Sequence, residues 1–69
     1  MKKKTKSIKS APRFVVCVSN RRYAASLERR KIYVVLPDRS AERVGHLRVI
    51  DESGDDYLYP KSLFATVSR

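Results

Sequence analysis

Apolar residues in this chain alternate with their neighbours in short runs, as they do in β-strands that present two different faces. Five such runs are rich in the β-branched and aromatic side chains that strands favour. They span residues 14–18, 31–36, 46–51, 57–59 and 64–67. We predict that one face of each run packs together with one loop leucine to form the core. These residues are Val16, Val18, Leu27, Ile32, Val34, Leu36, Leu47, Val49, Leu58, Phe64 and Val67.

Turn-forming residues separate these runs. Pro37 ends the second run, because a proline cannot donate a hydrogen bond to a β-ladder. Residues 41–44 suit a single helical turn, with Ser40 as its N-cap and Gly45 as the left-handed residue that ends it. Gly54 lies in an acidic hairpin loop at a position that favours positive φ. Residues 60–63 suit a 3₁₀ turn before the last strand.

The segment RRYAASLERR, residues 21–30, allows two interpretations. Its alanine, leucine, glutamate and arginine residues favour a helix. However, it has no clear cap and is short for a stable helix. We interpret it as an irregular loop that points Tyr23 and Leu27 inward, and a short helix is the alternative.

Charge is distributed unevenly along the 69 residues, which suffice for one small domain. Sixteen basic and seven acidic residues give a net charge of +9. Residues 1–12 contribute five lysines and no acid, and their low hydrophobicity predicts a disordered basic tail. Residues 13–69 form the predicted domain, in which eleven basic minus seven acidic residues leave +4.

No targeting or membrane-spanning pattern is present in the sequence. The basic start is not followed by the apolar stretch of a signal peptide. The longest apolar run, residues 14–18, is far short of the ~20 residues that span a bilayer. We therefore expect a cytoplasmic protein with no membrane partner.

No cluster of side chains predicts catalysis, a cofactor or a metal site. Cys17 and His46 are the only cysteine and the only histidine, so neither a disulfide within the chain nor a zinc-binding set is available. Cys17 lies in an apolar run, as a buried free cysteine does. His46 suits a partly exposed strand position. The four acidic residues within 51–56 do not match the spacing of a calcium loop and suit a solvated hairpin tip.

Two segments resemble SH3 domains. ASLERRKIYVVL, residues 25–36, is similar to their passage from a loop into a strand, and YPKSLFATV, residues 59–67, is similar to their closing segment. The stretch from Phe14 also resembles a group of small, uncharacterised bacterial proteins with a VLPD…G-x-x-RVIDESG-x-DYLYP core. These resemblances imply a five-stranded SH3-like β-barrel with a short helical turn, and no established activity.

Peptide-binding SH3 domains recognise proline-rich ligands on an aromatic groove built around a tryptophan. This chain has no tryptophan, and Leu63 stands where the resemblance places a ligand-contacting tyrosine. Recognition of proline-rich peptides is therefore not expected. A likeness in fold does not by itself transfer a function.

The best candidates for a binding surface are the basic residues of the 21–31 segment and nearby tyrosines. They are Arg21, Arg22, Tyr23, Arg29, Arg30, Lys31, Tyr57 and Tyr59. Basic side chains and interleaved tyrosines suit RNA or DNA, because cations neutralise phosphates and aromatic rings stack on bases. The basic cluster and the acidic loop also suit docking on a protein of complementary charge. We expect a non-enzymatic, monomeric binding module, with a protein partner favoured over a nucleic acid.

Overall fold

The computed structural model describes residues 13–67, so the tail predicted at residues 1–12 lies outside the described residues. Within residues 13–67, five strands and two short helical segments follow one another. They are β1 (Arg13–Cys17), β2 (Ile32–Leu36), α2 (Arg39–Arg43), β3 (His46–Ile50), β4 (Asp56–Pro60), the 3₁₀ turn η1 (Lys61–Leu63) and β5 (Phe64–Thr66). The predicted mainly β fold with five strands is confirmed.

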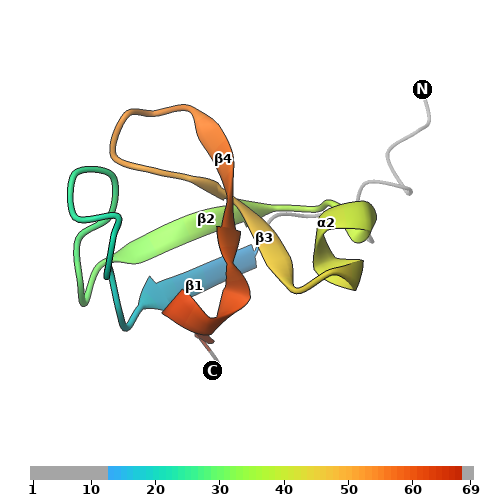
Figure 1. The fold of residues 1–69 in the computed structure, drawn as a ribbon, viewed down its shortest axis with the longest axis horizontal. Helices are drawn as coiled ribbons and strands as arrows, with labels where there is room; N and C mark the ends of the chain where they lie inside the picture. The colour runs from blue at the N-terminus through green and yellow to red at the C-terminus, as the bar shows by residue number, and fades with distance from the viewer. Residues whose placement is uncertain (1–12, 68–69) are drawn as a thin grey trace.

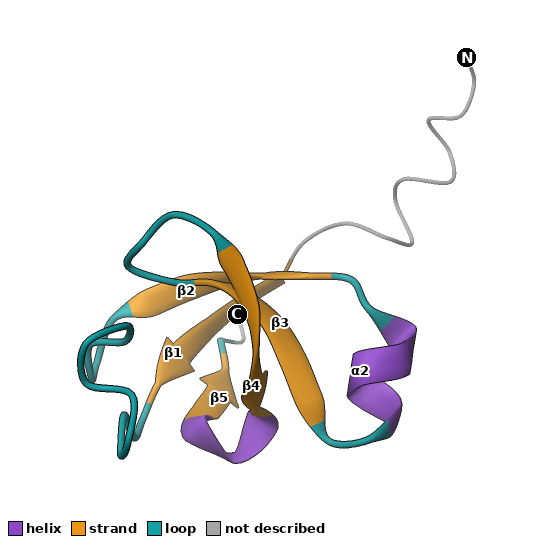
Figure 2. Ribbon diagram, turned by 45° about the horizontal axis from the view of Figure 1, so that its top comes forward, coloured by secondary structure: helices purple, strands orange, loops and turns teal. Residues whose placement is uncertain are grey.

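The strands form one antiparallel sheet in the order β4-β3-β2-β1-β5. β1 lies inside the sheet and pairs with β2 on one side and with β5 on the other. The sheet curls into a half-barrel, with α2 at one end and the long loop between β1 and β2 at the other (Figures 1 and 2). β4 and β5 are therefore the two edges of an open sheet.

The concave face of the sheet holds the core, together with one residue from the β1–β2 loop and one from η1. The core residues are Val15, Cys17, Leu27, Tyr33, Val35, Leu47, Val49, Tyr59 and Leu63. The prediction that Leu27, Leu47 and Val49 are buried is confirmed. On β1, β2 and β4, however, the buried residues are the ones that alternate with those predicted.

Most of the residues predicted to form the core are not buried. Four of them are between 44% and 56% exposed: Val18, Ile32, Leu58 and Val67. Half-buried positions among those predicted are Val16, Val34, Leu36 and Phe64, of which Phe64 packs against the edge of the core. Both faces of RFVVC and IYVVL carry apolar side chains, so alternation alone does not identify the inner face.

Two turn residues adopt the predicted backbone, whereas the helix cap differs. Gly45 and Gly54 have φ values of +81° and +90°, as expected for the end of a helix and for a hairpin loop. The N-cap of α2 is Asp38 and not Ser40, because an Asp38 carboxylate oxygen accepts a hydrogen bond from the Ala41 N–H at 3.0 Å. The other Asp38 oxygen lies 2.7 Å from Arg48 on β3, which fixes α2 against the sheet.

The segment between β1 and β2, residues 18–31, is an irregular loop, as predicted for residues 21–30; we call the whole segment the basic loop. It is fixed at its base, where the Val18 N–H donates to the Leu63 C=O at 2.8 Å and the Arg30 N–H donates to the Cys17 C=O at 2.7 Å. In its middle, Leu27 enters the core and Asn20 donates to the Leu27 C=O at 3.0 Å. The basic loop is therefore a packed part of the domain.

Candidate functional site

Two tight turns of the basic loop each present a pair of arginines. The first turn is closed by the Tyr23 N–H, which donates to the Asn20 C=O at 2.8 Å. The second arginine of each pair, Arg22 or Arg30, has a left-handed backbone with φ of 71° or 72°. Such a backbone costs an ordinary L-residue about 1 kcal/mol or more and favours glycine or asparagine. Arginine thus occupies two positions where the backbone alone favours another residue.

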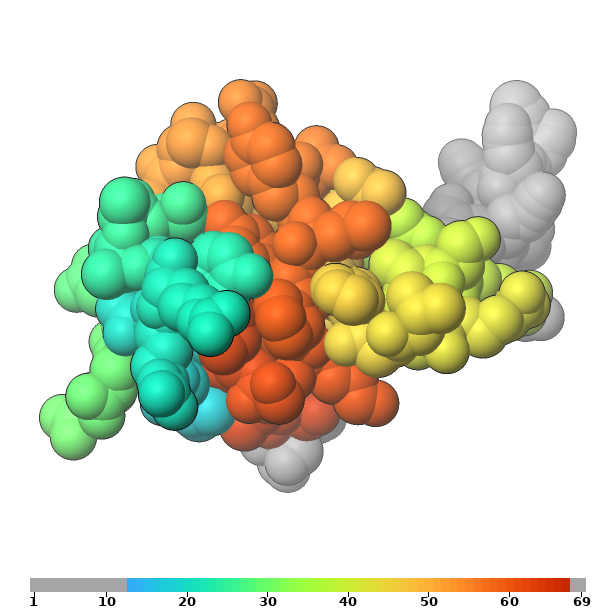
Figure 3. Space-filling view, viewed as in Figure 1, coloured from blue at the N-terminus to red at the C-terminus, as the bar shows by residue number. Residues whose placement is uncertain are grey.

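The charges of these arginines are not neutralised within the described part of the chain. Arg21, Arg22, Arg29 and Arg30 are all exposed, and none forms an ion pair with a carboxylate of residues 13–67. The basic loop projects from the side of the molecule away from α2, where it appears in cyan to green in Figure 3. Four guanidinium groups are therefore free to meet an external anion.

Lys31, the fifth basic residue of the predicted surface, is already paired. Its ammonium group lies 2.7 Å from a carboxylate oxygen of Glu52, and this contact raises the pKa of Lys31. Both side chains are partly exposed, so the pair contributes little to stability. Lys31 fastens the basic loop to the β3–β4 hairpin and is not an open ligand contact.

The tyrosines of the predicted surface are mostly not at the surface. Tyr59 is only 4% exposed and belongs to the core. Tyr23 is half-buried, and its ring packs edge-on against Tyr59 with centroids 5.0 Å apart. Tyr33 on β2, a further tyrosine close to the basic loop in the sequence, is also buried. Tyr57 on β4 is 53% exposed and is the only mostly exposed ring among these four.

Asp51 in the acidic segment is buried, which differs from the predicted solvated hairpin tip. Its carboxylate accepts hydrogen bonds from the Tyr59 hydroxyl at 2.5 Å, from the Ser53 hydroxyl at 2.6 Å and from the Ser53 N–H at 2.9 Å. Burial by itself raises the pKa of Asp51, but these hydrogen bonds outweigh it and hold the pKa below its usual value. The Asp-x-Ser pattern, typical of an Asx-turn, is the sequence signal for this contact.

The neighbouring carboxylates are also engaged within the domain. Glu52 accepts a hydrogen bond from the Tyr33 hydroxyl as well as contacting Lys31. Burial and the hydrogen bond to Glu52 raise the pKa of Tyr33 to about 12. Asp56 lies 3.0 Å from Arg48. Both carboxylates already have partners within the domain, which leaves the basic loop as the stronger candidate for charge-directed docking.

An exposed apolar surface borders the basic loop at both of its ends. Val18 begins the loop and Ile32 follows it, and their side chains are 49% and 56% exposed. The ladder places Val16 opposite Ile32 and Phe14 opposite Val34, so these side chains lie together on the convex face of the sheet. We call this surface the convex patch. Its members are Phe14, Val16, Val18, Ile32 and Val34.

A small open groove lies between the first arginine turn and η1. It has a volume of about 260 Å³ and is lined by Arg21, Arg22, Tyr23, Pro60, Ser62 and Leu63. Its lining combines arginines with apolar side chains, which suits a ligand that carries both negative charge and apolar groups. The groove therefore extends the candidate surface from the basic loop towards the end of β4.

Catalytic and metal chemistry find no support among the described residues. Cys17 is fully buried, its Sγ donates to the Ser19 C=O at 3.3 Å, and burial raises the pKa of its thiol. A raised pKa leaves less of the thiolate that a nucleophile requires. Residues 13–67 contain no group of three or more His, Cys, Asp or Glu side chains placed to hold a metal ion. The helices within the same residues are too short to cross a membrane.

Comparisons with protein-family models, with curated proteins and with solved structures found no match to this chain.

Proposed function

We propose that this chain is a non-enzymatic, monomeric binding module that docks a protein partner on the basic loop and the convex patch. One observation carries the proposal: four arginines that have no ion-pair partner among residues 13–67 lie in a loop whose two ends continue into exposed Val18 and Ile32. Protein interfaces combine arginine with apolar side chains in this way. A charged loop that served only to prevent aggregation would not need an exposed apolar surface beside it. The partner presents acidic residues to the loop and apolar residues to the patch.

A nucleic acid is the second candidate partner. The net charge of +9, with five lysines in residues 1–12, favours contact with phosphates. Against it, Tyr23 is half-buried and Tyr33 and Tyr59 are buried, so these rings do not offer the open faces on which bases stack. We therefore place a protein partner first.

The proposed relationship to SH3-like barrels is supported by the order of the elements. A long loop follows β1, a meander of strands comes next, and a 3₁₀ turn leads into the last strand, which returns to pair with β1. The groove beside η1 lacks a tryptophan and has Leu63 buried beneath it. For this reason the proposed ligand is an acidic protein segment and not a proline-rich peptide.

The proposal predicts that capture of a protein partner depends on the loop arginines and not on charge alone. The tests are R21Q/R22N and R29Q/R30N, in which asparagine suits the left-handed positions. R39Q/R43Q in α2 removes the same charge from exposed positions outside the loop and is the matched control. In nuclease-treated lysate of the native cell, we expect each loop variant to lose partner capture and the α2 variant to retain it.

Two results would contradict the proposal. Equal capture by the loop variants and the α2 variant would show that the basic loop has no special role. Loss of all capture on nuclease treatment would show that nucleic acid carries the interaction. Near-identical melting temperatures of the variants would confirm that binding, and not folding, has changed.

A further inference from the structure

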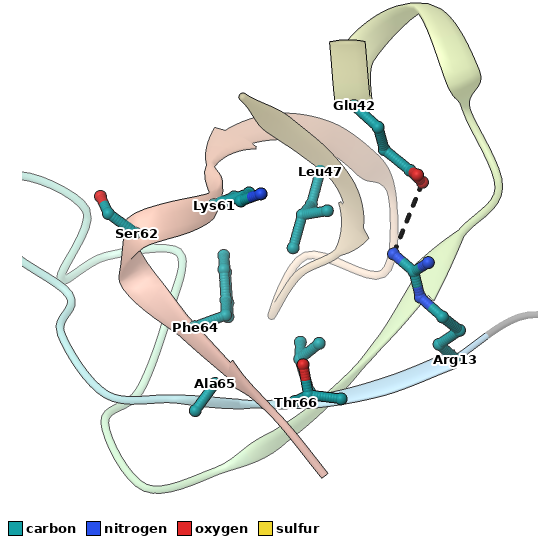
Figure 4. A pocket seen from close by; sticks show the side chains of 9 residues that line it. Arg13, Glu42, Leu47, Lys61, Ser62, Phe64, Ala65 and Thr66 are labelled. Carbon is teal, nitrogen blue, oxygen red and sulfur yellow. Dashed lines mark hydrogen bonds and ion pairs between the residues drawn. The ribbon is translucent and has the colours of Figure 1, made fainter. Parts of the chain in front are cut away.

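A second groove lies on the open side of the half-barrel, between β5 and α2 (Figure 4). It has a volume of about 610 Å³. Val15, Leu47 and Phe64 give it an apolar floor, and Arg13, Glu42 and Lys61 carry charge into its lining. This groove has no lining residue in the basic loop, and it shares only Ser62 of η1 with the smaller groove.

Along this groove, the backbone of β5 has hydrogen-bonding groups that find no partner among residues 13–67. The Val18 N–H donates to the Leu63 C=O and the Val67 N–H donates to the Phe14 C=O. In an antiparallel ladder, bonded and non-bonded pairs alternate. Within the ladder, Ala65 therefore bonds to Val16, while the backbone groups of Phe64 and Thr66 point away from β1.

One of these outward groups has a partner and the others do not. The Phe64 N–H donates to the Lys61 C=O and closes η1. The Phe64 C=O and both backbone groups of Thr66 have no hydrogen-bond partner among residues 13–67. Strand edges with free donors and acceptors are templates for a further strand.

The other edge of the sheet is blunted. Asp51 and Lys61 mark the bonded pairs of the β3–β4 ladder. By the same alternation, the backbone groups of β4 that point outward are those of Asp56, Leu58 and Pro60. Pro60 has no N–H to donate, and Asp56 places a charge on this edge. β5 has neither a proline nor a charged residue. Of the two edges, β5 is the one suited to pairing.

We propose that this groove binds an extended, acidic protein segment, which pairs with Thr66 and Phe64 as a further strand beside β5. Alternate apolar side chains of the segment face Val15, Leu47 and Phe64. Acidic residues face Arg13 and Lys61.

Charge favours an acidic segment of another protein over the tail of this chain or a second copy of it. Arg13 and Glu42 form an ion pair of 3.5 Å with partly exposed side chains, which is weak and easily exchanged for a ligand carboxylate. Lys61 has no ion-pair partner within residues 13–67. The chain's own residues 1–12, with five lysines, and a second copy with net charge +9 are both electrostatically disfavoured.

The test is an NMR titration of the full chain with a defined peptide. The probe is a blocked ten-residue peptide in which valine alternates with threonine and glutamate, and its counterpart has lysine in place of each glutamate. We expect the acidic peptide to shift and protect the amides of Phe64 and Thr66, and the lysine peptide to bind at least about tenfold more weakly. Binding of both peptides alike, or of neither, would overturn the proposal.

Thr66→Pro isolates the backbone contact. It removes the outward N–H without touching the β1 ladder, so the fold should persist while peptide affinity falls by about tenfold or more. Thr66→Ser keeps the N–H and should bind as the unaltered chain does.

If Thr66→Pro alters the spectrum of the whole domain, R13E/K61E provides the second test. This variant should bind the lysine peptide more tightly than the acidic peptide. Undiminished binding by Thr66→Pro in a folded domain, or an unchanged preference in R13E/K61E, would overturn the proposal.

Two further results identify other occupants and would also overturn it. Tighter peptide binding after deletion of residues 1–12 would mean that the tail occupies the groove. A dimer that Thr66→Pro dissociates would mean that a second copy does. Peptide binding is measured at the amides of β5, and the basic loop is altered in a separate variant, R21Q/R22N. Failure of this proposal can therefore be distinguished from failure of the proposed function.

Discussion

Replacing Leu27 by alanine will lower the free energy of unfolding by about 2–5 kcal/mol, although Leu27 lies in a loop. Its side chain is 1% exposed and belongs to the same core cluster as Val35 and Val49. A domain of this size buries a limited core and is only marginally stable, so this loss removes much of its stability. Equilibrium denaturation in urea measures the change.

The matched control is Ile32→Ala on the convex face. Ile32 is 56% exposed, so its truncation should cost far less than that of Leu27, about 1 kcal/mol or less from lost strand propensity and its cross-strand contact. If Ile32→Ala is as damaging as Leu27→Ala, the convex patch is buried in solution and cannot serve as a free docking surface. If Leu27→Ala is harmless, the basic loop is not packed on the core.

The second large effect is expected at Asp51. Asp51→Ala removes the acceptor of the buried Tyr59 hydroxyl and of two Ser53 donors. A buried donor left without a partner costs about 1–3 kcal/mol, so we expect a loss in this range or above it. Asp55→Ala, at the exposed hairpin tip, is the control and should be nearly neutral. Equal stabilities of the two variants would contradict the structural role of Asp51.

The pH dependence of stability follows from the same contact. Because the folded domain holds the pKa of Asp51 below its usual value, its contribution is fully present above the unfolded value of about 4. That contribution is lost as the pH falls through the folded pKa. Asp38 and Glu52 also have lowered pKa values and act in the same direction. Asp51→Ala should therefore flatten, without abolishing, the fall of melting temperature below about pH 4. An unchanged acid profile would contradict this assignment.

Strand positions and turns could be predicted from local patterns, whereas the inner face of the sheet could not. Gly45 and Gly54 occupy positions where the backbone requires a left-handed residue, which is a local signal. Both faces of IYVVL are apolar, and which of the two faces is buried depends on Tyr33. Its hydroxyl reaches Glu52, nineteen residues away, so a pattern confined to the strand does not contain the contact that permits burial.

The candidate site, like the fold, could be predicted from the sequence only in part. The exposure of Arg21 and Arg29 follows from their charge, and the inward position of Leu27 follows from its being the only leucine in the basic loop and the only large aliphatic residue of its middle. The pairing of Lys31 with Glu52 joins two loops and has no local signal. The convex patch could not be recognised from the sequence, because four of its five residues were predicted to lie in the core. These four are Val16, Val18, Ile32 and Val34. The free edge of β5 depends on ladder register, which only the folded chain defines.

The most direct test of the proposed function is an NMR titration of the full chain at near-physiological salt. The ligands are a glutamate-rich peptide containing leucines and, in parallel, a single-stranded RNA. We predict that the peptide shifts amides of residues 18–31 together with those of Phe14 and Ile32, and that RNA binds these residues no more tightly than about 10⁻⁴ M, the weak end of non-specific binding. The opposite result, tighter RNA binding at the basic loop with no response to the peptide, would contradict a protein-docking role and establish nucleic acid as the partner.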